Sequence, residues 1–137
     1  MADELRKVRE GFGAALEDLD GVRVYRYAPA GMPNDLPAIT LDRIDVEYQQ
    51  VVGDGKIRGT LRATLLVQHV DAEEGRAMLE SFMDVAGSNS IYEVIDADRT
   101  LDGNVSVCWL EGFTEANLRQ IVEVPVQATV VTFGFMT

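Results

Sequence analysis

Residues 60–74, TLRATLLVQHVDAEE, contain two different hydrophobic patterns in succession. In the first part apolar and polar side chains alternate, which predicts a strand with one buried face. The apolar side of this strand consists of Leu61, Ala63, Leu65 and Val67. In the second part, residues 71–74, an aspartate is followed three positions later by a glutamate, the pattern of a capping box at the start of a helix. The stretch therefore predicts a half-buried strand that leads directly into a helix.

Helices are predicted on both sides of this strand. Residues 3–19 carry apolar side chains at helical spacing, and Asp20 with Gly21 ends the pattern. The helix that follows residue 71 is expected to stop at Gly87. The residues expected to face the core are Leu5, Val8, Phe12, Leu16 and Leu19 in the first helix, and Met78, Leu79, Phe82, Val85 and Ala86 in the second.

Further strands are predicted from shorter alternating runs. They lie at residues 22–27, 37–41, 44–48, 104–109 and 121–135. The run at 44–48 is out of phase with the run before it, which indicates a bulge or a break near Arg43. Pro125 in the last run has no amide hydrogen, which predicts that this strand lies at a sheet edge or bends there.

A turn signal separates residue 48 from the strand at 60–70. Asp54 and Gly55 favour a tight turn, so residues 49–59 are expected to form a projecting, flexible hairpin. The predicted order is helix, strand, strand, hairpin, strand, helix, helix, strand, strand. Strand pairs with short connections favour a mostly antiparallel sheet with helices packed on one face, which is an α+β fold.

The sequence GSNSIYE at residues 87–93 has two interpretations. Small polar residues before a helix start are typical of phosphate-binding loops. However, Ser90 and Glu93 also match a capping box, in which each side chain bonds the other residue's amide. The amides would then already have partners, and the carboxylate would repel a phosphate. We therefore interpret the segment as a connection between two helices, the second of which buries Ile91, Val94 and Ile95.

Two other motifs match a binding site only in part. Residues 53–56, GDGK, lack the more distant glycine and the following Ser or Thr of a phosphate-binding loop. Residues 98–103, DRTLDG, place oxygen ligands as a calcium loop does, but position twelve is Trp109 where a glutamate is needed. A hairpin turn and a capped turn are the expected structures. No metal site and no cofactor site are predicted.

The single cysteine and the single histidine set the limits for catalysis. Cys108 excludes an internal disulfide, and we expect a buried structural thiol. A nucleophilic Cys108 would need His69 as its base, an arrangement that stays open as the lesser alternative. Paired carboxylates occur only as sequence neighbours, which point to different helix faces, so no catalytic residue is assigned.

Composition narrows the class of protein further. The chain has 137 residues, which predicts a single domain spanning 1–137. Its net charge of −11 argues against a general nucleic-acid-binding surface. Basic residues are scattered except for Arg6, Lys7 and Arg9 in the first helix. No apolar run approaches the ~20 residues of a membrane span, and the charged N-terminus does not match a secretion signal.

The segment 87–105 resembles a known family. Its pattern, GS followed by a short helix and then D-x-T-L-x-G-x-V, is similar to that of tail terminator proteins from long, non-contractile-tailed bacteriophages. The order of the remaining features also agrees: an N-terminal helix, a proline-bearing loop, PAITL, DVEY before a hairpin, HVD before a helix and a valine-rich last strand. The resemblance covers nearly the whole chain and rests on structural motifs.

The resemblance implies a structural function in the virion. Similar proteins are made in the host cytoplasm and form a ring, usually of six copies, at the head-proximal end of the tail tube. The ring stops polymerisation of the major tail tube protein and offers a surface to the head-completion or stopper protein, while DNA passes through its lumen. Residues near the hairpin are then candidates for contact with a neighbouring copy or ring: Glu47, Tyr48, Asp54, Lys56 and Arg58. An acidic lumen would keep DNA from adhering.

Two alternatives stay open. The nearer alternative is another ring protein of the same neck, such as an adaptor or stopper, or a structural protein of a related contractile tail. The more distant alternative is a small enzyme with a ligand pocket between sheet and helices, which uses His69 and an acidic residue.

Overall fold

The computed structural model describes residues 4–19, 21–27, 37–48, 57–68, 72–115, 119–121 and 124–137. The elements in chain order are α1 (Glu4–Leu16), β1 (Arg23–Tyr25), β2 (Ala38–Tyr48), β3 (Ile57–Gln68), α2 (Ala72–Met83), α3 (Ile91–Ala97), β4 (Val107–Glu115), β5 (Arg119–Ile121) and β6 (Val124–Met136). This is the predicted order with one additional short strand, β5. None of the described helices is long and apolar enough to cross a membrane.

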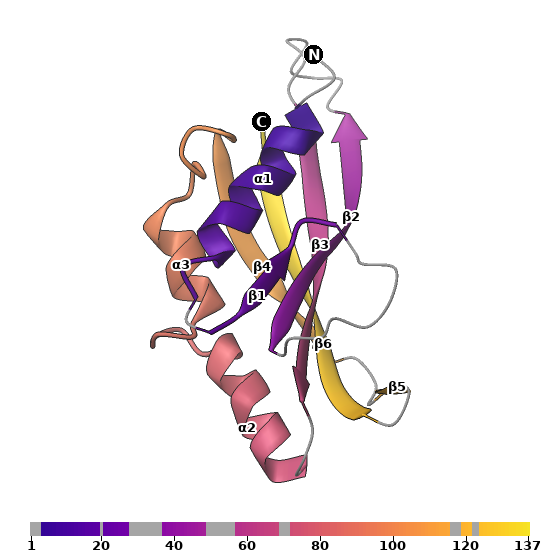
Figure 1. Cartoon of the computed structure of the whole chain (residues 1–137). Helices are drawn as coiled ribbons and strands as arrows, with labels where there is room; N and C mark the ends of the chain where they lie inside the picture. Colours follow the sequence, from indigo (N-terminus) through magenta and orange to yellow (C-terminus); the bar gives the residue numbers. More distant parts are fainter. Residues whose placement is uncertain are drawn as a thin grey trace.

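The strands form one sheet in the order β1-β2-β3-β6-β4, and β5 pairs with the beginning of β6. All neighbours are antiparallel except β1 and β2, which run parallel. Figure 1 shows the three helices on one face of this sheet. The predicted α+β class with a mostly antiparallel sheet is therefore confirmed.

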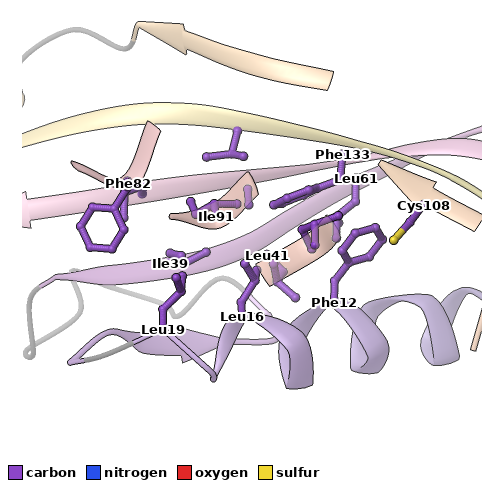
Figure 2. Close-up of a cluster of buried hydrophobic side chains, with 14 of the residues drawn as sticks. Phe12, Leu16, Leu19, Ile39, Leu41, Leu61, Phe82, Ile91, Cys108 and Phe133 are labelled. Carbon is purple, nitrogen blue, oxygen red and sulfur yellow. The ribbon is translucent and has the colours of Figure 1, made fainter. Parts of the chain in front are cut away.

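The core lies between the helices and the sheet face that they cover. The four apolar residues of the opening stretch, Leu61, Ala63, Leu65 and Val67, are each fully buried there. Phe12 of α1 packs on Phe133 of β6 with 5.0 Å between ring centroids, and Figure 2 shows both rings among aliphatic side chains from β2 and β3. Burial of one such aromatic side chain contributes about 1.5–3 kcal/mol, so these contacts hold α1 on the sheet.

The bulge predicted near Arg43 is present. Leu41 pairs with Ala63 and the next paired residue, Ile44, pairs with Leu61, so β2 uses one residue more than β3 over this step. The extra residue returns Ile44 to the core side, where it packs against the buried cluster. The hydrophobic phase shift in the sequence therefore has a direct structural cause.

Both long helices end earlier than predicted. Helix α1 ends at Leu16, although Leu19 in the following turn is still buried. Helix α2 ends at Met83 rather than at Gly87. Leu79 and Phe82 of α2 are buried as predicted. The inward placement of Met78, Val85 and Ala86 was wrong, because all three residues are exposed, Met78 at 42% and Val85 at 70%.

Of the two alternatives predicted for Pro125, an edge strand or a bend, the edge strand was wrong, because β6 lies between β3 and β4 in the sheet. The described pairing of β3 with β6 runs as far as Gln68 opposite Val126, and Pro125 is the next residue of β6 beyond it. On the β5 side, Pro125 lies opposite Gln120. The sequence predictions that lie outside the described residues include the aspartate of the capping box at 71–74, the hairpin turn at 54–55, the position of His69 and the interface candidates Asp54 and Lys56.

Candidate interaction surfaces

The GSNSIYE segment forms a tightly bonded corner between α2 and α3. Ser90 is the N-cap of α3, and its fully buried hydroxyl accepts a bond from the amide of Glu93 at 3.1 Å. The same hydroxyl donates to the carbonyl of Asp84 at 2.6 Å. The Glu93 carboxylate accepts from the amide of Gly87 at 3.1 Å and not from that of Ser90, which donates to the Gly87 carbonyl. The predicted bond from the Glu93 amide to the Ser90 hydroxyl is therefore present. The predicted bond from the Ser90 amide to the Glu93 carboxylate is not, because this carboxylate bonds the Gly87 amide and so connects the two sides of the corner.

The turn that resembled a calcium loop is held by its own hydrogen bonds. The Asp98 carboxylate accepts from the hydroxyl of Thr100 at 3.0 Å and from the amide of Asp102 at 2.8 Å. These bonds support two residues, Leu101 and Asp102, at positive φ angles of 50° and 57°. Across the described part of the chain no group of acidic, His or Cys side chains is placed to hold a metal ion.

Cys108 points into the core from β4 and is fully buried. Loss of hydration on burial raises the pKa of its thiol to about 11, and the nearby Asp98 adds to the rise. A thiol with this pKa stays neutral near pH 7 and is a poor nucleophile. This agrees with the structural role expected for Cys108.

The predicted interface residues lie at the end of the β2–β3 pair, as far as the structure describes them. Glu47 is directly opposite Arg58, and both side chains are exposed. Tyr48 pairs through its backbone with Ile57. Asp54 and Lys56 lie outside the described residues. Glu47 and Arg58 can form a cross-strand pair of opposite charges, and their contact with a neighbour stays a prediction.

The sheet face away from the helices carries a mixed set of charges around the single tryptophan. Because Cys108 faces the core, the next residue, Trp109, faces away from it. Its indole lies directly against Gly134, where an added Cβ would be 2.3 Å from a ring atom. The Arg58 guanidinium lies 5.9 Å from the indole centroid, within reach of a cation–π contact. Glu111 accepts the indole N–H at 3.3 Å.

A shallow cavity of about 400 Å³ lies where the first turns of α1 meet the bulge of β2. Arg9 is fixed in its wall, because its guanidinium donates to the carbonyls of Arg26, Leu41 and Asp42 at 2.8, 2.8 and 3.1 Å. The guanidinium carbon also lies 4.6 Å from the centroid of the Tyr27 ring. We call this site the arginine pocket. It is lined by Leu5, Arg6, Arg9, Tyr27, Asp42, Arg43 and Ile44.

Sequence analysis found only part of the arginine pocket. The cluster of Arg6 and Arg9 in the first helix was visible in the sequence. Arg43 and Tyr27 come from other strands and loops, and only the fold brings them to the same cavity. The bulge at residues 41–44 contributes to the pocket, because it interrupts the regular pairing of β2 with β3 at the point where Arg9 bonds two β2 carbonyls.

A second surface lies at the α2–α3 corner, and we call it the corner surface. It consists of Glu80, Met83, Asp84, Val85, Tyr92 and Glu93, all exposed. Its apolar members are substantially open to solvent, at 42% for Met83, 70% for Val85 and 40% for Tyr92. Sequence analysis missed this surface because it had assigned Val85 to the core.

The chain was compared with protein-family models and with curated proteins. No family model matches it, and no curated protein matches it. Fold and surface geometry thus carry the functional argument, together with the resemblance of residues 87–105.

Proposed function

We propose that this protein is a tail terminator, a structural virion protein that forms a ring at the head-proximal end of a long, non-contractile phage tail. In this role it stops tube polymerisation and offers a docking surface to the head-completion or stopper protein. The observation that carries the proposal is the segment 87–105, whose pattern is similar to that of tail terminators. In the structure this segment is a capped α3, a bonded turn and the approach to β4.

The fold supports the proposal in a second way. A ring needs each copy to present two different, complementary surfaces to its two neighbours. The described residues include two such unlike surfaces, one rich in arginine and one rich in carboxylates and apolar side chains. Glu47, Tyr48 and Arg58, with Asp54 and Lys56 in the adjoining hairpin, would face a stacked ring or a neighbour. With a net charge of −11, the lumen would be acidic and would let DNA pass without adhering.

The test combines assembly with tube capping. The purified protein is measured by light scattering, and the same fraction is imaged by negative stain. It is then added to tail tube protein of the same virus during polymerisation. We expect rings with an open channel, binding at one end of each tube and arrest of tube growth. Tubes that grow unchanged in the presence of the protein would refute the proposal.

The alternatives predict other outcomes of the same experiment. An adaptor or stopper would form rings that bind the portal side and leave tube growth unchanged. A small enzyme would bind a ligand and show a melting temperature that rises with ligand concentration. Neutralising acidic residues found to line the channel should slow DNA passage if the acidic lumen matters.

A further inference from the structure

The arginine pocket is a local concentration of positive charge in an acidic protein. Three of the chain's twelve Lys and Arg residues line it beside one carboxylate, that of Asp42, in a chain whose net charge is −11. Arg9 is held by backbone carbonyls, so its charge has a fixed position. Arg6 is exposed, and the Arg43 side chain is 65% exposed although it pairs with Asp45 at 3.0 Å. Tyr27 adds an apolar ring that is 61% exposed.

The corner surface has the complementary chemistry. It combines the carboxylates of Glu80, Asp84 and Glu93 with apolar side chains that the core does not use. The bonds of Ser90 and Glu93 tie together the backbone of the corner between Asp84 and Glu93, from which most of these side chains extend. A preformed surface loses less conformational freedom when a partner binds, which favours its use as an interface.

The two surfaces are remote from each other within one chain. Figure 1 shows the start of α1 at one end of the helical layer, whereas the α2–α3 connection lies near its middle, beyond the other end of α1. A surface on one copy can therefore meet its complement only on another copy. Contact between unlike surfaces is heterologous, and repetition of such a contact closes a ring when the rotation permits.

We propose that the arginine pocket of one copy receives the corner surface of the next copy. Arg6 and Arg43 face carboxylates of the corner, while Tyr27 and Leu5 cover its apolar side chains. The pairing removes exposed apolar area from water on both copies, and charge complementarity sets its direction around the ring. The proposal rests on the proposed ring for its biological role and adds which two surfaces close it.

The test uses reciprocal charge reversal. One variant carries Arg6→Glu with Arg43→Glu, and the other carries Glu80→Lys with Asp84→Lys. Self-association is measured by sedimentation velocity over a concentration series, with circular dichroism to show that each variant is folded. Because attraction is replaced by repulsion, each variant alone should associate roughly tenfold more weakly or worse than the wild type.

Mixing the two variants distinguishes this pairing from general charge effects. In a ring that alternates the two variants, every contact joins two reversed surfaces or two unchanged surfaces. An equimolar mixture should therefore form such alternating rings. A matched control for the arginine variant, Arg23→Glu with Arg62→Glu, lowers the net charge by the same amount at exposed sites outside both surfaces and should associate as the wild type does. The single change Arg6→Glu tests the pocket again if the double variant fails to fold.

Three outcomes would overturn the pairing. They are wild-type-like association of both reversed variants, failure of the mixture to restore it, and a wild type that does not self-associate at any concentration tested. In each case the tube-capping assay still judges the proposed function separately. If the charge-reversed variants still form rings that cap tubes, the proposed function is retained and this interface is refuted.

Discussion

Ser90→Ala gives the most direct test of how the α2–α3 corner is held. The Ser90 hydroxyl is fully buried and makes two bonds in opposite directions. As N-cap it satisfies the amide of Glu93, and as donor it satisfies the carbonyl of Asp84. Alanine removes both bonds and leaves almost no change in volume.

The magnitude follows from these two bonds. Replacement of a serine N-cap by alanine costs about 1 kcal/mol. Loss of the bond to the Asp84 carbonyl costs about 1 kcal/mol more, because the buried position limits its replacement by water. The sum of about 2 kcal/mol should lower the melting temperature of a domain of this size by roughly 6–10 °C.

The assay is urea and thermal unfolding followed by circular dichroism. Ser88→Ala is the matched control, because Ser88 is exposed two positions earlier in the same loop. We expect it to change the free energy of unfolding by less than about 0.5 kcal/mol. Equal losses in the two variants would refute the capping argument. A wild-type melting temperature that rises specifically with phosphate would favour the phosphate-binding interpretation instead.

Three further predictions concern the core and the sheet. Gly134→Ala places a Cβ 2.3 Å from an atom of the Trp109 indole, so the ring must move. We expect a red-shifted fluorescence of this single tryptophan and a decrease of about 1–3 kcal/mol in the free energy of unfolding. The control Gly112→Ala, with nothing within 4 Å of its added Cβ, should show neither change. Cys108 should resist thiol reagents in the folded state near pH 8. Burial raises the pKa of its thiol from 9.0 to about 11. The contribution of this thiol to stability is therefore full below pH 9 and is lost as the pH rises from about 9 towards 11. Unfolding measured at several pH values should show this loss, and the loss should be absent in Cys108→Ala. Phe12→Ala should cost about 3–5 kcal/mol in urea unfolding, because it empties a fully buried site against the sheet; a loss below 1 kcal/mol would show that α1 is not anchored there.

Much of the fold could be predicted from the sequence because the signals are local and periodic. The alternation in residues 60–67 identified the buried face of β3, since side chains on a strand point to alternate faces. The phase shift near Arg43 predicted the bulge for the same reason. Ser90 correctly indicated the start of α3, because an N-cap residue bonds only to residues a few positions away in the sequence.

The candidate surfaces were less predictable because they depend on distant parts of the chain. The exposure of Met78 and Val85 follows from where α2 ends and how it lies on β3 and β6. Helical periodicity alone places such residues near the core, but it does not set where the helix stops. The role of Arg9 could be determined only when the fold placed the carbonyls of Arg26 and Leu41 beside it.

The sequence by itself determined the identity, order and buried faces of most elements, and it suggested through residues 87–105 the class of protein to consider. Only the tertiary structure decided the parallel β1–β2 pair, the interior position of β6 and the meeting of Arg6, Tyr27 and Arg43 in one pocket. The physical reason is the range of the interactions. Caps and periodic faces are set by neighbours a few residues apart, whereas sheet order and surface patches are set by contacts between segments far apart in the chain.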